Sequence, residues 1–281
     1  MSDFQSSLNT PSDSPLGKSS AYRSDYAPEL LFPIPRRGKR EEIGVDEAAL
    51  PFVGEDLWNA YELSWLDPRG KPVVALGEFR VPASSPCLIE SKSLKLYLNS
   101  FNQTRLAGLG EAQALIARDL SQAAGSEVQV CLQSLDAERV FVKPVGVCLD
   151  AQEIEIDRYQ PEPELLRADP ARVVQNELLY SHLLKSNCLV TGQPDWGAVF
   201  VRYSGLAIDR EALLRYIVSF REHNEFHEQC VERIFCDLMR QCRPATLMVW
   251  ARYTRRGGLD INPCRVTPGM SLAENLGEVR Q

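Results

Sequence analysis

Alternation between apolar and polar residues predicts a β-hairpin in the first third of the chain. In residues 57–66 the apolar side chains of Tyr61, Leu63 and Trp65 recur at every second position, as in a strand with one buried face. The turn sequence DPRG follows and leads into a second run at residues 71–81. Two strand-like runs joined by such a turn are typical of an antiparallel hairpin.

Helical periodicity and further strands complete two similar halves. The first half predicts two helices and then the strand EVQVCLQSL, and the helices cover residues 92–104 and 111–123. The second half predicts strands near 188–203, helices at 209–221 and 224–241, and the strand TLMVWARYT before the turn RRGG. We therefore predict an α+β fold of two tandem units, each an antiparallel four-stranded sheet with two helices on one face. The open edges of such sheets favour side-by-side assembly into a barrel.

The two halves also align with each other without a gap. At an offset of 119 positions, the matched pairs are Leu94 with Leu213, Tyr97 with Tyr216, Leu98 with Ile217, Ser100 with Ser219, Phe101 with Phe220, Leu115 with Ile234, Leu120 with Met239, Val128 with Leu247, and Val130 with Val249. Identity is low, but the apolar register persists from helix to strand. This favours an internal duplication.

Composition divides the chain into four segments. Residues 1–44 are rich in Ser, Pro and charge, and we expect an extended arm with little structure of its own, in which the basic run PRRGKREE is solvated. The first unit is predicted at 45–157 and the second at 181–281. A Pro- and Glu-rich stretch beginning at RYQPEPELL predicts a linker at 158–180.

The charge and the N-terminal residues restrict the class of protein. A net charge of −7 argues against direct nucleic-acid binding and against a membrane-surface role, since both need a basic face. No apolar run reaches the length of a membrane span, and the first residues lack the pattern of a signal peptide. We expect a cytoplasmic protein.

The eight cysteines include no CxxC pair, which favours reduced and mostly buried thiols. Cys230, Cys236 and Cys242 recur every six residues, a spacing that does not place them on one helix face. Core packing is the better interpretation, and no metal site is predicted.

Cys188 and Asp195 are the first pair of residues with chemical potential. They lie seven residues apart, and Gly192 and Pro194 between them predict a loop rather than a helix. A thiol and an acid on one loop suit nucleophilic catalysis. A half-buried cysteine beside a turn-forming aspartate is the structural alternative.

A second motif, ESKSLKLY, begins where a strand should give way to a helix. Ser91 or a neighbour is expected to cap this helix, and a helix N-terminus attracts anions such as phosphate. Lys92 and Lys95 lie on nearly the same face and are suited to contact phosphates. A capped amphipathic helix with solvated lysines remains the alternative.

Two further motifs lie in the second half. In HNEFHEQCVERI, His223 and His227 are predicted to share a helix face, but the HxExH spacing does not match the zinc-protease motif. The carboxylate of Glu228 is able to accept two hydrogen bonds from a guanine-like N–H and amino group, or it lies on a solvated helix face. Arg256 and Gly257 belong to the turn RRGG, which suits a phosphate or is a plain hairpin turn.

No Rossmann fingerprint is present, because GLGEAQ lacks the third glycine and lies between predicted helices. Taken together, the four motifs closely resemble the 7-cyano-7-deazaguanine reductases, the NADPH-dependent nitrile reductases of queuosine biosynthesis. The resemblance extends from about residue 16 to residue 264. It has the layout of the long, two-unit form, which is built on the tunnelling fold and forms homodimers.

The resemblance implies a role for each site residue. Cys188 matches the nucleophile, Asp195 matches the proton-transferring acid, and His227 matches a position that assists later proton transfers. The substrate contacts implied for the deazaguanine are Ile89, Glu90, Ser91, His227 and Glu228. The NADPH contacts implied are Ser91, Lys92, Arg256 and Gly257.

Two other functions remain open from the residues alone. The tunnelling-fold superfamily includes zinc-dependent cyclohydrolases that act on GTP, and Cys188, His223 and His227 would form the corresponding metal trio. A non-catalytic purine-binding protein would need only the carboxylate of the pocket.

Overall fold

The computed structural model describes residues 10–15, 17, 22–137 and 140–281. The chain divides into two compact units. The first consists of the described residues up to Glu42 together with those of Trp58–Glu138 and Arg256–Leu259. The second consists of Ile43–Leu57, the described residues of Arg139–Arg255, and Asp260–Gln281.

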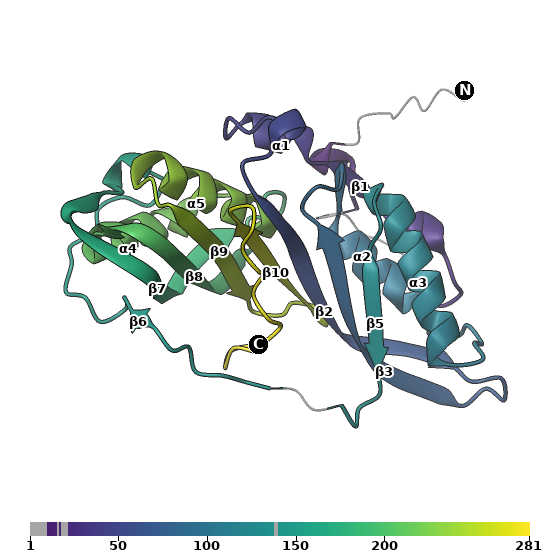
Figure 1. Cartoon of the computed structure of the whole chain (residues 1–281). Coiled ribbons are helices and arrows are strands. Elements are labelled where there is room, and N and C mark those ends of the chain that lie inside the picture. The colour runs from purple at the N-terminus through teal and green to yellow at the C-terminus, as the bar shows by residue number, and fades with distance from the viewer. Residues whose placement is uncertain (1–9, 16, 18–21, 138–139) are drawn as a thin grey trace. The chain divides into compact units, whose positions relative to one another are not determined.

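The sheet of the first unit follows the predicted hairpin. Its strands are β2 (Val53–Leu66, of which 58–66 belong to this unit), β3 (Pro72–Pro82) and β5 (Gln129–Gln133), in the order β5-β3-β2. Strands β3 and β5 are antiparallel, from Leu76 opposite Gln133 to Arg80 opposite Gln129. Helices α2 (Ser91–Asn99) and α3 (Leu109–Ala124) lie together beside this sheet (Figure 1).

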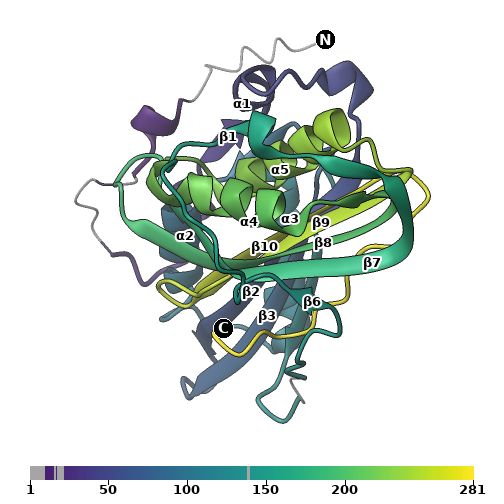
Figure 2. The same ribbon diagram turned by 90° about the vertical axis from the view of Figure 1, so that its left-hand side faces the viewer.

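The second unit contains the complete predicted order of strands and helices. Its elements are β7 (Ala168–Asn187), β8 (Pro194–Ile208), α4 (Arg210–Ser219), α5 (His227–Gln241), β9 (Thr246–Tyr253) and β10 (Leu259–Val266). The strand order is β10-β9-β8-β7-β6, with both helices over one face of the sheet (Figure 2). Neighbouring strands from β10 to β7 are antiparallel.

The predicted α+β class, with antiparallel sheets and helices on one face, is confirmed. The two units differ in the strand that follows the helices. In the second unit β9 and β10 follow α5 and complete four antiparallel strands. In the first half of the chain, the strand after β5 is β6 (Val147–Cys148). This strand belongs to the second unit, where it pairs in parallel with β7.

The predicted linker at 158–180 needs a correction. Residues 168–180 are part of β7, and only a short 3-10 helix, η4 (Pro163–Leu165), interrupts the segment before it. The pairing of β7 with β8 has three register shifts, and many residues of its first half are exposed. Bulges interrupt the alternation on which a strand prediction rests, so this half of β7 resembles a linker in sequence.

The N-terminal arm is also more structured than predicted, although residues 1–9, 16 and 18–21 lie outside the described part. Strand β1 (Pro33–Pro35) pairs with β4 (Cys87–Ile89), and the short helices η1 (Pro11–Asp13), η2 (Pro28–Leu30) and α1 (Arg37–Glu41) flank it. Another short helix, η3 (Glu47–Ala49), follows in the second unit.

The basic run PRRGKREE is not simply solvated. The side chains of Arg36 and Arg40 are buried. Arg36 Nε donates to Ser85 Oγ at 3.2 Å, and an Arg40 guanidinium nitrogen donates to the Ala83 carbonyl at 2.6 Å. Two arginines of this run therefore hold the arm to the first unit.

The helix pairs of the two units contain the same side-chain arrangement. Tyr97 Oη donates to Asp119 in the first unit at 2.7 Å, and Tyr216 Oη donates to Asp237 in the second at 2.6 Å. Burial raises the pKa of both tyrosines, and the neighbouring carboxylates raise it further. The shared arrangement supports the predicted duplication.

The arrangement corrects the predicted alignment in the second helix of each unit. Tyr97 and Tyr216 are 119 positions apart, but Asp119 and Asp237 are only 118 apart. At the shorter offset the buried residues of α3 coincide with those of α5: Ala112 with Cys230, Ile116 with Ile234, Leu120 with Leu238, and Ala124 with Cys242. The gap-free register is therefore one residue out along this helix.

The cysteines of α5 are core residues, as predicted. Cys230, Cys236 and Cys242 are buried, and burial raises the pKa of the Cys236 and Cys242 thiols to about 12 and about 11. All eight cysteines of the chain are free thiols. Among the helices of the described residues, none is long and apolar enough to cross a membrane.

Candidate active site

The predicted site residues of the second unit gather at one end of the β7–β8 hairpin. Asn187 opposite Pro194 is the last strand pair, and Ser186 lies opposite Asp195. Beyond them the Cys188 N–H donates to the Gln193 carbonyl at 2.8 Å. The predicted loop is thus a short turn, and Asp195 already belongs to β8.

The turn leaves the thiol nearly buried. Cys188 is 9% exposed and Asp195 is 3% exposed. The Gly192 N–H donates to the Cys188 carbonyl at 3.0 Å, with Gly192 at a positive φ of 65° that favours glycine. Backbone pairing at the end of the hairpin therefore sets where the Cys188 thiol and the Asp195 carboxylate lie.

His227 approaches the same hairpin from α5. It is the first residue of that helix, and its Nε2 lies 3.8 Å from Asp195 Oδ1. Its ring meets the Tyr253 ring edge-on, with centroids 4.0 Å apart and planes at 90°. Tyr253 lies on β9 opposite Gly197, where a Cβ would come within 3.0 Å of the tyrosine ring. The glycine thus makes room for the ring that supports the imidazole.

Tyr253 is a site residue that sequence reasoning missed. Its only signal is its place at the end of the predicted strand TLMVWARYT, which does not distinguish it from other core aromatics. Burial raises the pKa of its hydroxyl far above the ordinary value, and the nearby Cys230 and Asp195 add to this. The hydroxyl of Tyr253 therefore stays protonated, and the residue supports the imidazole by packing rather than acting as an acid or a base.

The segment between α4 and α5 ties the hairpin end to the start of α5. The Asn187 N–H donates to the His223 carbonyl at 2.8 Å, and the Glu225 N–H donates to the Asn187 carbonyl at 3.0 Å. Asn187 Nδ2 also donates to Asn224 Oδ1 at 3.0 Å. This arrangement fixes the position of His227 relative to the turn that carries Cys188.

The prediction that His223 and His227 share a helix face is wrong. The structure has a 3-10 turn, η5 (Phe220–Glu222), that ends before His223, and α5 begins only at His227. His223 Nε2 lies 3.2 Å from a Glu225 carboxylate oxygen, and Arg233 forms an ion pair with the same carboxylate at 2.6 Å. Although burial acts in the opposite direction, these partners hold the pKa of Glu225 below its ordinary value.

The metal trio of Cys188, His223 and His227 is not formed. In the part of the chain that the structure describes, the cluster with metal-ligand potential consists instead of Cys148, Asp150 and His182. The imidazole of His223 is directed to Glu225. The geometry therefore gives no support to a zinc-dependent cyclohydrolase centre.

Glu228 follows His227 in the first turn of α5. It is 3% exposed, and the start of a helix stabilises a carboxylate through the helix dipole and the free N–H groups. Glu228 is therefore buried and does not lie on a solvated helix face. A buried carboxylate beside the catalytic candidates suits recognition of a ligand with N–H donors.

The remaining predicted contacts belong to the first unit, at the start of α2. Ile89 ends β4 opposite Pro33, and Glu90 follows as the N-cap of the helix. The Glu90 carboxylate accepts the Lys92 N–H at 2.7 Å and the Ser93 N–H at 2.8 Å. Burial raises the pKa of Glu90, while these hydrogen bonds lower it in part. The helix cap is therefore Glu90, a neighbour of Ser91, within the prediction of Ser91 or a neighbour.

One of the cationic residues predicted for NADPH, Lys92, lies partly exposed in the first turn of α2. Its Nζ donates to the Pro15 carbonyl at 3.1 Å. The turn of Arg256 and Gly257 lies next to α2, since a Cβ on Gly257 would be 3.2 Å from the Lys95 side chain. Gly257 has a positive φ of 56°, as a glycine turn allows.

A separate cavity of about 610 Å³ lies in the second unit. It is lined by the strand residues Phe200, Arg202 and Trp250 and by the segments around 142–145 and 271–278, and none of the predicted site residues lines it. The chemistry of the hairpin end, and not the size of this cavity, identifies the candidate site.

A buried thiol and a buried carboxylate at one hairpin end, with an imidazole 3.8 Å from that carboxylate, suit the class of enzymes that use a cysteine nucleophile. Residues 22–132 match the family described as "Nitrile reductase, 7-cyano-7-deazaguanine-reductase N-term", and residues 194–269 match the family described as "QueF-like protein".

Curated relatives are similar over almost the whole chain. An NADPH-dependent 7-cyano-7-deazaguanine reductase of Azoarcus sp. (strain BH72) is 65% identical over 283 residues, covering 100% of both chains. Reductases of the same name from Aromatoleum aromaticum and Dechloromonas aromatica are each 63% identical, covering 95% of both chains. The chain belongs to the NADPH-dependent 7-cyano-7-deazaguanine reductase family, which confirms the predicted resemblance.

Proposed function

We propose that this chain reduces the nitrile of 7-cyano-7-deazaguanine to the aminomethyl group of 7-aminomethyl-7-deazaguanine, with NADPH as the reductant, in tRNA queuosine biosynthesis. The observation that carries the proposal is the arrangement of Cys188, Asp195 and His227 at one hairpin end, in a chain whose relatives carry that name. We further propose a homodimer in the cytoplasm that does not bind nucleic acid directly. The acidic charge and the family's long form support these points.

The first chemical step uses residues of the chain alone. A nitrile carbon is a weak electrophile, so direct hydride addition is difficult, whereas a thiolate adds to form a thioimide. Asp195 takes the Cys188 proton and delivers it to the nitrile nitrogen, so that the S–C bond forms as the triple bond becomes a C=N bond. The low exposure of both residues keeps water away from the adduct.

The later steps need two hydrides for one product. When bound, NADPH supplies a hydride to the thioimide carbon and, after Cys188 leaves, a second cofactor supplies one to the imine. His227 assists the later proton transfers: its Nε2 lies 3.8 Å from the Asp195 carboxylate, so a proton passes between them once the two side chains approach to hydrogen-bond distance or a water bridges them. The edge-on contact with Tyr253 holds the imidazole in this orientation.

Recognition of the substrate and cofactor is shared among the other predicted residues. The Glu228 carboxylate accepts hydrogen bonds from the N–H and amino groups of the deazaguanine edge, and Ile89, Glu90 and Ser91 complete its contacts. The cofactor fits the residues present, since Lys92 and Arg256 carry the positive charges that its phosphates need and Gly257 lies in the same turn as Arg256. We propose that the two compact units are the two tunnelling-fold units. Their bounds differ from the predicted 45–157 and 181–281, because 43–57 and 139–157 belong to the second unit and 256–259 to the first.

The test isolates the first step. Protein and 7-cyano-7-deazaguanine without NADPH should form a covalent adduct, seen by intact-protein mass spectrometry as one added substrate mass on the peptide that contains Cys188. Cys188→Ala should abolish the adduct and turnover, and Asp195→Asn should slow adduct formation sharply. Cys131→Ala, which removes an exposed thiol, is the matched control and should change neither.

Two results would contradict the proposal. One is an adduct that maps to another cysteine, or turnover that persists in Cys188→Ala. The other is consumption of one NADPH per product with an imine or aldehyde accumulating, because a nitrile needs four electrons to become an amine.

A further inference from the structure

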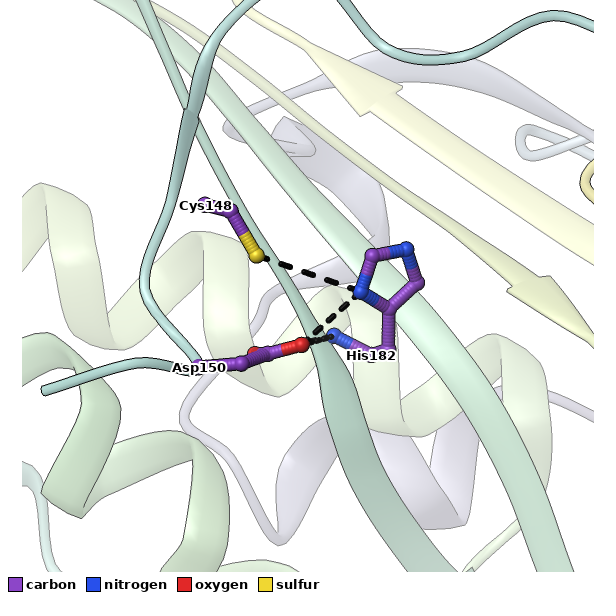
Figure 3. A group of neighbouring side chains, drawn as sticks. All are labelled: Cys148, Asp150 and His182. Atoms are coloured by element: carbon purple, nitrogen blue, oxygen red, sulfur yellow. Dashed lines mark hydrogen bonds and ion pairs between the residues drawn. The ribbon is translucent and has the colours of Figure 1, made fainter.

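Cys148, Asp150 and His182 bring three different metal-binding atoms together in the second unit, away from the hairpin end that carries Cys188. Figure 3 shows the three side chains converging, with His182 Nδ1 between the other two. Nδ1 lies 2.8 Å from Asp150 Oδ2 and 4.0 Å from Cys148 Sγ. The three donor atoms lie within 4.8 Å of one another.

The parallel pairing of β6 with β7 produces this convergence. Cys148 lies opposite Tyr180, and the next N–H, that of Leu149, donates to the Tyr180 carbonyl at 2.9 Å. Cys148 ends β6 and Asp150 begins the turn that follows, and both side chains face His182 (Figure 3). Gly146 allows the close approach, because a Cβ there would be 2.6 Å from the Leu178 carbonyl oxygen.

A second shell of hydrogen bonds supports the three side chains. Ser181 Oγ donates to Asp150 Oδ1 at 2.6 Å. On the far side of the imidazole, Nε2 of His182 lies 3.5 Å from Glu278, whose carboxylate is 5% exposed. A buried carboxylate on the non-ligating nitrogen is the arrangement that fixes the tautomer of a metal-binding histidine. With the proton on Nε2, Nδ1 presents its lone pair to Cys148 and Asp150.

From this geometry we infer that Cys148, Asp150 and His182 bind a divalent transition-metal ion of the zinc class. One thiolate, one imidazole and one carboxylate are ligands that zinc accepts, and the partly exposed site leaves a fourth position for water. Tetrahedral zinc places ligand atoms about 3.3–3.6 Å apart. The 2.8 and 4.0 Å separations lie on either side of that range, so small side-chain rotations satisfy it.

The ion would fasten the segment that carries Cys148 to strand β7. Strand β6 pairs with β7 at only two positions, which is little to hold the segment in place. The ion would add a cross-link between Asp150 and His182, which are 32 positions apart in the sequence. Its role is separate from nitrile reduction, since the site shares no residue with Cys188, Asp195 and His227. The inference is therefore independent of the proposed catalytic function.

The test uses Co²⁺ as a spectroscopic probe on full-length protein stripped with a chelator. One equivalent should give a thiolate-to-cobalt charge-transfer band and tetrahedral d–d bands, and Zn²⁺ should displace it. At a hundredfold excess over its dissociation constant, Zn²⁺ should raise the Tm by about 5 °C. Cys148→Ala should abolish the charge-transfer band, and His182→Ala should weaken binding at least tenfold, each with nitrile reduction retained.

Matched variants locate the ion. Cys188→Ala and Cys131→Ala should both keep the full spectrum, since one removes the active-site thiol and the other an exposed thiol without these neighbours. A charge-transfer band that persists in Cys148→Ala and disappears in Cys188→Ala would overturn the inference. So would the absence of stoichiometric binding to the wild-type protein, which would leave His182 in a plain Asp–His hydrogen bond.

Discussion

Replacing Glu228 by glutamine tests the recognition carboxylate at almost constant volume. Glu228 is 3% exposed, so any ligand it meets is largely removed from water. The change removes one acceptor and directs an NH₂ group at a ligand donor. A hydrogen bond to a charged group contributes about 1.5–3 kcal/mol, so the Kd for the deazaguanine should rise about 10- to 150-fold. The Tm should fall by only about 2–4 °C, because the lost charge at the start of α5 contributes about 1 kcal/mol.

Binding is best measured by calorimetric titration in the Cys188→Ala background, where no covalent adduct forms. Glu222→Gln is the matched control, since it makes the same chemical change at an exposed position five residues before His227. It should leave the Kd unchanged. An unchanged Kd in Glu228→Gln, with the fold intact by circular dichroism, would refute the role of Glu228 in recognition.

Four further substitutions probe the cofactor contacts and the second unit. Lys92→Ala and Arg256→Ala should each raise the KM for NADPH about tenfold, the equivalent of one charge-assisted hydrogen bond, with the KM for the nitrile unchanged in steady-state kinetics; equal effects on both constants would contradict a phosphate contact. Tyr216→Phe removes the 2.6 Å hydrogen bond to Asp237 and should lower the free energy of unfolding by about 1–3 kcal/mol in a urea titration; a wild-type midpoint would contradict this. The pKa of Glu225 is lowered in the folded state, so its stabilisation is present above its unfolded pKa of about 4.3 and is lost as the pH falls through the lower folded value. Glu225→Gln should therefore flatten the acid side of the Tm–pH curve, and an unchanged slope below about pH 4.5 would refute the linkage.

The duplication shows what apolar periodicity alone predicts correctly and where it fails. An offset of 119 positions aligned apolar residues through the helices and strands, and it is the offset between Tyr97 and Tyr216. Along the second helix the true offset is one shorter, as the partners Asp119 and Asp237 show. Apolar positions in a helix recur after three and after four residues, so a slip of one residue still matches many of them. Burial in the folded units distinguishes the two offsets, and the pattern by itself does not.

For the candidate site residues too, the sequence predicted some features correctly and others not. The sequence determined their identities, because Cys188, Asp195 and Glu228 are chemically distinctive residues in short motifs. It misplaced His223, since helical spacing was extended through a segment whose hydrogen bonds go to Asn187 instead. It also had no signal for Tyr253, an aromatic strand residue like many core residues until its ring meets His227.

By itself, the sequence determined the first hairpin, the helices and the candidate nucleophile, because local periodicity, turn residues and reactive side chains are read within a few positions. Only the tertiary structure decided which distant residues meet. Cys148 and Asp150 reach His182 through a two-residue parallel pairing and a glycine that permits close approach. Such a register depends on how strands align across the sheet, and no local pattern around residues 148 or 182 encodes it.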